Sequence, residues 1–106
     1  MINNTAPGVR LPAAFSDPEL LKIADIDWLV SMTLQQDGYD GTALASAAAA
    51  INKFASYTGL DSENDLAVTA MTDLLANLMH LCSAIDLPFR ELLSRAGEHF
   101  EYETGS

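Results

Sequence analysis

Apolar side chains recur at helical intervals near the centre of the 106-residue chain, and this pattern constrains its fold more than any other feature. The intervals are four, three, four, three and four residues, and the positions are Ala67, Met71, Leu74, Leu78, Leu81 and Ile85. The same stripe is widened by Val68, Leu75, Met79 and Cys82. Such spacing is typical of one face of an α-helix, and an apolar arc this wide needs packing neighbours on two sides. The pattern predicts an all-α protein.

Two short helices are predicted before this one. The segment Ser16-Asp17-Pro18-Glu19 is a helix-start signal, because Ser or Asp caps free amides, Pro fits the first turn and Glu favours the positive end of the dipole. The buried side of this helix is expected to consist of Leu20, Leu21, Ile23 and Ala24. A second helix is predicted from Ile26 to Gln35 or Gln36, with Asp25 or Asp27 as its cap. The Gly- and Asp-rich segment 37–41 is expected to end it.

Two longer helices complete the prediction. One runs from Thr42 to Thr58, with Gly59 as a left-handed cap. Its apolar positions are Leu44, Ala47, Ile51, Phe54 and Thr58. The other runs from about Pro88 to Tyr102. It is expected to bury Phe89, Leu92, Leu93, Ala96 and Phe100. We therefore predict a compact bundle of about five helices, with a flexible N-terminal arm over residues 1–15 and a single helical domain over 16–103.

The charge of the chain limits its partners. Fifteen Asp and Glu oppose five Lys and Arg, which gives a net charge of −10, and residues 41–60 contain no carboxylate. A surface of this sign repels phosphate backbones and anionic lipids, so direct binding to nucleic acid or to a membrane is not expected. Cys82 is the only cysteine and lies among apolar residues, which predicts a buried thiol and a reducing compartment. No stretch approaches the length of a membrane span, and the protein is expected to be cytoplasmic.

One polar group on the central helix has the spacing of a functional site. Asp73, Asn77 and His80 are four and three residues apart, which places them on one helix face. They resemble half of a metal site or an acid–base pair, and the alternative is an ordinary solvated face. His80 and Cys82 point about 200° apart on a helix, so they do not form a joint zinc pair. The chain has neither a phosphate-binding loop nor a nucleophile elbow, and we predict no cofactor and no metal.

The acidic residues form two candidate partner-binding patches. The first consists of Asp61, Glu63, Asp65 and Asp73. The second consists of Glu91, Glu98, Glu101, Tyr102 and Glu103. Carboxylates one helical turn apart lie about 6 Å from each other, close to the spacing of phosphates on a strand. An acidic helical domain can therefore mimic DNA and occupy a groove built for nucleic acid, although net negative charge also serves solubility alone.

Three segments carry a resemblance to known proteins. Thr72 to Cys82 and Ala84 to Leu93 resemble the tail of MazG-type all-α nucleotide pyrophosphohydrolases, and Gly97 to Glu103 resembles small helical proteins of phages and plasmids. The MazG-type family holds magnesium with acidic pairs on two successive helices. Here the helix over 42–58 has no acid, and the next helix offers Asp73 with Asn77. These departures remove ligands that a hard cation requires.

We expect a small, acidic, non-enzymatic binding protein of bacterial mobile-element type. It would block a surface of a host nucleic-acid-binding or defence complex, in the manner of an anti-CRISPR inhibitor. The resemblance implies one alternative, a MazG-like nucleotide pyrophosphohydrolase with Asp73, Glu63 or Asp65 around magnesium. The other alternative is a self-associating structural subunit, paired through residues 47–50 or the stripe over 74–85. A homodimer is favoured, because four other short helices hardly cover a two-sided stripe.

Overall fold

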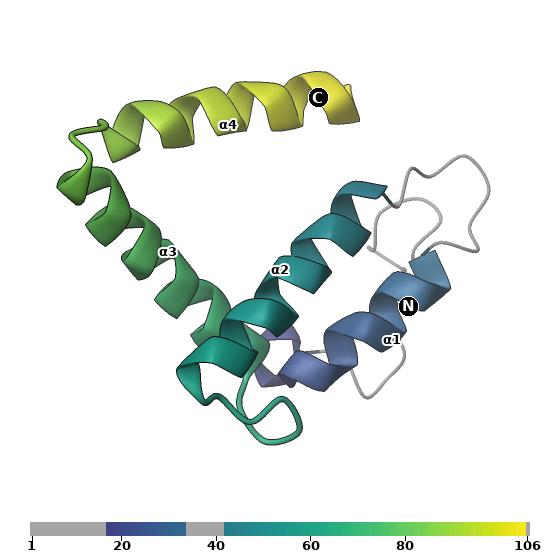
Figure 1. Ribbon diagram of the computed structural model, residues 1–106. Helices are drawn as coiled ribbons and strands as arrows, with labels where there is room; N and C mark the ends of the chain where they lie inside the picture. Colours follow the sequence, from purple (N-terminus) through teal and green to yellow (C-terminus); the bar gives the residue numbers. More distant parts are fainter. Residues whose placement is uncertain (1–16, 34–41, 106) are drawn as a thin grey trace. The chain divides into compact units, whose positions relative to one another are not determined.

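A computed structural model describes residues 17–33 and 42–105 of the chain. The prediction of an all-α fold is confirmed for these residues (Figure 1). The prediction of about five helices is not, since the described ranges contain four α-helices and one 3₁₀-helix. The predicted arm over 1–15 and the predicted turn over 37–41 lie outside the described residues.

The first helical element of the described residues is a single turn, the 3₁₀-helix η2 (Pro18–Leu20). The Asp17 carboxylate caps it by accepting a hydrogen bond from the Glu19 amide at 3.1 Å. The chain then extends, and α1 (Ile23–Thr33) begins three residues before the predicted Ile26. The prediction that Leu20, Leu21, Ile23 and Ala24 form one buried helical side is therefore wrong. Leu20 is 63% exposed and Ala24 is exposed, whereas Ile23 is fully buried.

Long-range backbone hydrogen bonds explain this departure. The amides of Ile23 and Ala24 donate to the carbonyls of Asp65 and Ser62, at 3.1 and 2.8 Å. In return, the Ala67 amide donates to the Leu21 carbonyl at 2.8 Å. The segment before α1 is thus paired with the loop before α3 (Ala67–Ala84), and its amides are satisfied by that loop instead of by a longer first helix. Within the first turn of α1 the Asp25 side chain accepts from the Lys22 amide at 2.8 Å, as the third residue of a helix does in a capping box, so Asp25 stabilises the start of α1 from inside the helix and is not, as predicted, the residue that precedes it.

The helix α2 (Thr42–Thr58) has the predicted bounds and lies beside α1 (Figure 1). Gly59 has φ +79°, and the Leu60 amide donates to the Ala55 carbonyl at 3.1 Å, which is the left-handed cap expected there. The buried residues of α2 are Ala48, Ile51 and Ala55. Ala47, predicted to be buried, is exposed. Ala48, Ile51 and Ala55 are three and four residues apart and so share one face of the helix. The small side chains of Ala48 and Ala55 allow close packing on that face, which is centred one residue beyond the predicted Ala47.

Contacts divide the chain into two compact units, Met1–Thr72 and Asp73–Ser106, and the boundary falls within α3. The second unit contains the remainder of α3 and the helix α4 (Phe89–Thr104). The two helices are joined by a four-residue turn, from which α4 departs at an open angle (Figure 1). The predicted bounds of both helices are confirmed to within a few residues. Cys82 is the only residue classed as buried in the described part of this unit.

The turn between α3 and α4 uses an unusual residue in a common motif. The amide of Leu87 donates to the Cys82 carbonyl at 2.8 Å, and that of Asp86 donates to the Ser83 carbonyl at 3.4 Å. These are the two hydrogen bonds of a Schellman motif. Asp86 has φ +62°, the left-handed conformation that such a motif requires and that glycine adopts with least strain. The turn is therefore well hydrogen-bonded but strained at one residue.

Replacing the residue at this position should stabilise the turn. We expect Asp86→Gly to raise the free energy of unfolding by roughly 0.5–1 kcal/mol, because the Cβ strain is removed at a cost in unfolded-state entropy. The measurement is urea unfolding followed by circular dichroism. Ala76→Gly, in the exposed interior of α3, is the control and should lose about 1 kcal/mol. A loss of stability in Asp86→Gly would instead give the Asp86 carboxylate a role in holding the turn.

Candidate functional site

The three polar residues singled out on the central helix lie on α3 and are exposed. Their spacing places Asp73, Asn77 and His80 on the side of the helix away from Leu78. No hydrogen bond or ion pair within the described residues joins them to one another. Each side chain therefore faces solvent independently, which is the arrangement of a solvated helix face.

The described residues give no site with the donors of a metal centre. Among them, no group of three or more His, Cys, Asp and Glu side chains is placed to hold a metal ion. Cys82 is only 7% exposed, so the prediction of a buried thiol is confirmed, whereas His80 is exposed.

Two carboxylates of the first acidic patch are engaged in building their own loop. Asp61 accepts hydrogen bonds from the Glu63 amide at 2.9 Å and from the Asn64 side-chain amide. The pKa of Asp61 is lowered, first by the Asn64 side chain and then by the Glu63 amide. Asp65 in turn accepts from the Asp61 amide at 2.7 Å. The fourth member of the patch, Asp73, belongs to the second compact unit.

The second acidic patch lies on α4, and all five of its residues are exposed. By the helical period, Glu91, Glu98 and Tyr102 share one face of α4, and Glu101 lies at its edge. Glu103 lies across the helix, beside the apolar side. In the described part of the chain one ion pair is formed, between Arg95 Nη2 and Glu91 Oε2 at 2.8 Å. Both side chains are more than half exposed, so the pair adds little stability.

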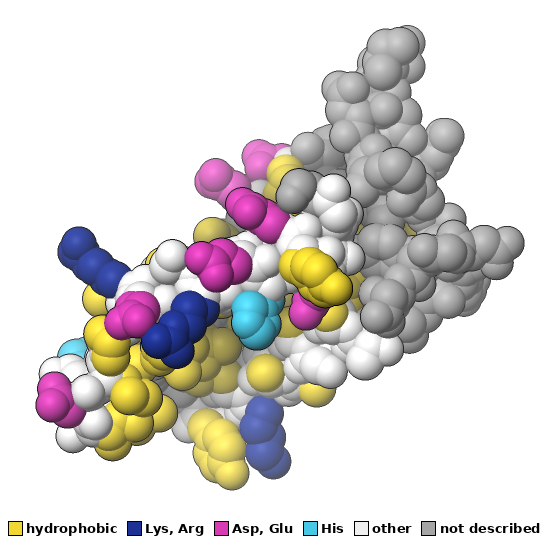
Figure 2. Space-filling model, turned by 90° about the horizontal axis from the view of Figure 1, so that it is seen from above, with side chains coloured by type: hydrophobic (Ala, Val, Ile, Leu, Met, Phe, Trp, Pro, Cys, Tyr) yellow, Lys and Arg dark blue, Asp and Glu magenta, His cyan; other side chains and the backbone are white. Residues whose placement is uncertain are grey.

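Large apolar side chains are exposed throughout the second unit. Eight of them are between 39% and 64% exposed: Leu75, Leu78, Met79, Leu81, Ile85, Leu87, Leu93 and Phe100. We call these eight residues the hairpin's apolar face. Figure 2 shows hydrophobic side chains gathered on the molecular surface, with acidic side chains close by. The stripe itself is evident in the sequence, but its exposure is not.

The structure corrects the expected packing of α4. Phe89 and Leu92 are half-buried, whereas Leu93, Ala96 and Phe100, which were also predicted to be buried, are exposed. No residue of α4 is buried. The physical reason is the open angle of the hairpin, since α4 meets α3 only near the turn (Figure 1).

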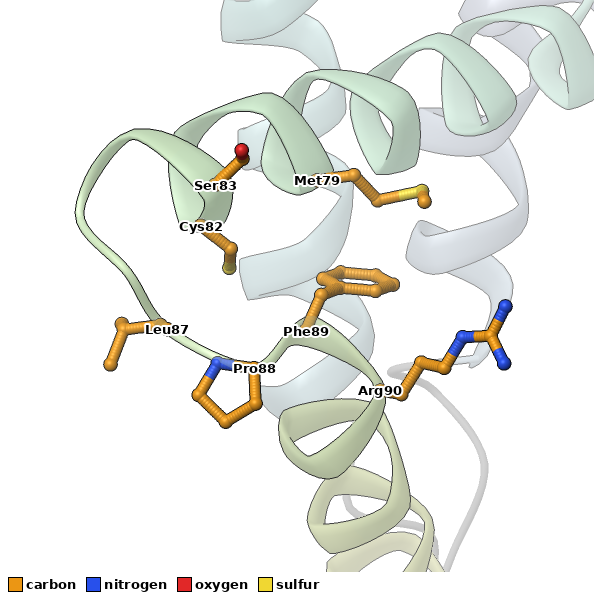
Figure 3. Close-up of a pocket in the computed structure, with 7 residues that line it drawn as sticks. All are labelled: Met79, Cys82, Ser83, Leu87, Pro88, Phe89 and Arg90. Atoms are coloured by element: carbon orange, nitrogen blue, oxygen red, sulfur yellow. The ribbon is translucent and has the colours of Figure 1, made fainter.

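A shallow pocket lies where the two helices meet. It has a volume of about 350 Å³ and is open to solvent (Figure 3). Its lining consists of Met79, Cys82, Ser83, Leu87, Pro88, Phe89 and Arg90. The Phe89 ring lies on the side of α4 that faces α3, whereas the Arg90 side chain extends outward (Figure 3). The lining is mostly apolar and contains no carboxylate, so the pocket offers a surface for apolar groups and no acid–base pair.

Among the helices of residues 17–33 and 42–105, none has the length and apolar character needed to cross a bilayer. Comparison of the chain with models of protein families, with curated proteins and with solved structures found no match.

Proposed function

We propose that this chain is a small, acidic, non-enzymatic protein that works by binding other protein surfaces, and that its helices form a compact bundle only when the chain is assembled with other chains. The observation that carries this proposal is the exposure of the hairpin's apolar face. Monomeric soluble proteins rarely leave contiguous apolar patches of more than a few hundred Å² open to water, and larger patches mark interaction sites. Asp73 is the only carboxylate among the eighteen residues of α3, which is a composition suited to a helix buried in an assembly.

The negative charge on one face of α4 would determine which kind of protein this chain binds. Glu91 and Glu98 lie on one side of α4 together with Tyr102, a residue type enriched at interfaces. On a chain with a net charge of −10, such a face is attracted to basic surfaces, and charge complementarity of this kind speeds association and excludes wrong partners. We propose that the partner is a basic, nucleic-acid-binding protein or defence complex, whose binding groove this chain blocks as an anti-CRISPR-like inhibitor would.

A pull-down with charge-reversed variants tests this function. The tagged protein captures its partner from nuclease-treated lysate of a bacterial host, and mass spectrometry identifies what is bound. We expect one stoichiometric partner that elutes with salt, and at least a ~10-fold loss of capture when Glu91, Glu98 and Glu101 are changed to Lys. The matched control changes Asp17, Glu19 and Asp27 to Lys, which alters the net charge by the same amount at exposed positions outside both acidic patches.

Two results would contradict the proposal. Equal capture by the wild type and the Glu91, Glu98 and Glu101 variant would remove the acidic face of α4 as the contact. Magnesium-dependent release of pyrophosphate from a panel of nucleoside triphosphates would contradict a non-enzymatic function and favour the MazG-like alternative.

A further inference from the structure

We infer that the hairpin's apolar face is covered by the same face of a second copy of this chain, so that two α3–α4 hairpins form a four-helix assembly about a two-fold axis. This inference rests on the proposal that the protein works through protein contacts, and it names the occupant of one surface. The second copy is an isologous partner, because each chain offers the other the same patch.

The first argument is the stability of the helices themselves. The second unit contains the last twelve residues of α3 and the sixteen residues of α4, and Cys82 is the only residue classed as buried in its described part. Isolated helices shorter than about 12–15 residues are marginal in water, and most helical stability in proteins comes from packing an apolar face. These helices have the apolar face but do not pack it within the described unit. A partner that covers the face supplies the missing stabilisation.

The second argument is area. Each of the eight side chains of the hairpin's apolar face exposes about half of its surface, which sums to roughly 750 Å² if each full side chain counts about 190 Å². A standard stable interface buries about 800 Å² on each partner. The eight side chains together therefore expose nearly the area that a stable dimer requires, and on α3 they extend over about 160° of the helix, from Leu81 to Met79, so the second copy must contact α3 on two sides to cover all of them.

The third argument is the distribution of charge, and it favours a second copy over a basic partner. On α3 the arc that carries Leu75, Leu78 and Leu81 contains no charged residue, and Asp73 lies on the other side. On α4 the carboxylates of Glu91 and Glu98 lie opposite the apolar side, and Glu103, in the last turn, is the one carboxylate of the helix on that side. A basic partner gains nothing by charge at such a face. Two chains of net charge −10 can meet there with these carboxylates directed outward.

The fourth argument is length. At 1.5 Å per residue, the twelve residues of α3 within the second unit extend about 18 Å and the sixteen of α4 about 24 Å, so most of α4 has a length of α3 to pair with. A four-residue connection is within the range that joins neighbouring antiparallel helices in bundles. The pocket beside Phe89 lies between α3 and α4 next to this connection.

Sedimentation equilibrium of the purified protein tests the inference. At about 100 µM, where a contact of this area is expected to be saturated, the wild type should have twice the chain mass of 11.4 kDa. Leu78→Glu places a charge within the apolar face and should weaken the dimer at least ~30-fold, which leaves a monomer at about 10 µM. Ala76→Glu, on the opposite side of α3, is the matched control and should stay dimeric.

The outcomes separate this inference from the proposed function. A wild-type monomer at about 100 µM, or a dimer that Leu78→Glu leaves intact, would overturn the inference; the second result would move the contact elsewhere, for example to the exposed alanines of α2. Unchanged Trp28 fluorescence in Leu78→Glu shows that the α1–α2 unit is still folded. The mass is measured without any partner, so a monomer that still captures a basic protein refutes only the dimer. A dimer that captures none refutes only the proposed function.

Discussion

Ile23→Ala is expected to lower the free energy of unfolding by about 3 kcal/mol, within the 2–5 kcal/mol range of buried Ile-to-Ala substitutions. Ile23 has no exposed surface and is the largest fully buried side chain among the described residues. It stands at the first position of α1, where its own amide is bonded to the loop before α3. The truncation leaves a cavity at the point where these elements meet. Urea unfolding followed by Trp28 fluorescence, at one fixed protein concentration, measures the loss.

Leu20→Ala provides the control for this substitution. Leu20 belongs to the preceding 3₁₀-helix and is 63% exposed, so its truncation should change the free energy of unfolding by less than about 0.5 kcal/mol. A loss below about 1 kcal/mol in Ile23→Ala would contradict the packing described for this unit.

Ala70→Asp is expected to have an effect of at least the same size. Ala70 has no exposed surface and lies one turn into α3. An aspartate there must bury an unpaired charge or push neighbouring elements apart, and we expect a loss of roughly 3–5 kcal/mol. Calorimetry should show a large fall in Tm or the absence of a cooperative transition. The control Ala76→Asp makes the same change at an exposed position six residues further along α3.

The two variants also locate the core of the first unit. If Ala70→Asp unfolds no more readily than Ala76→Asp, the start of α3 does not pack into the core, and the backbone pairing between residues 21–24 and 62–67 would be its only attachment. A large difference between them places Ala70 in that core.

The longer helices could be predicted from the sequence because their signals are local. The spacing of apolar residues and Gly59 together predict α2 with its observed bounds. The stripe that includes Leu74 and Cys82 predicts α3, and Pro88 marks the junction before α4. In each case the residues that determine the structure lie within a few positions of one another.

The start of the fold could not be predicted in the same way. A capping residue at Asp17 and apolar residues after it suggest an ordinary helix, and the cap is indeed formed. What limits the helix to one turn is the pairing of residues 21–24 with a loop about forty residues later. That competition is tertiary, and no local pattern in the sequence reports it.

The candidate site shows the same division between local and tertiary information. The apolar stripe of α3 can be predicted from the spacing of its residues. Whether other helices cover that stripe depends on the tertiary structure, which the spacing does not report. In the structure α4 departs from α3 at an open angle, and Leu93 and Phe100 of α4 stay exposed. The loop role of Asp61 and Asp65 had a local signal, because Asp side chains commonly bond amides two residues on. The number of acidic residues in a segment does not show which carboxylates form hydrogen bonds within a loop and which are available to contact another protein.

Hydrogen–deuterium exchange across α3 and α4 tests the central claim most directly. If the hairpin's apolar face is covered by a second copy, the amides of residues 74–93 should be protected to an extent comparable with those of α2, because opening these helices then requires the assembly to separate. If the face is bare, helices of this length fray readily. Rapid exchange throughout residues 74–93 at the highest attainable protein concentration, with α2 still protected, would contradict the account.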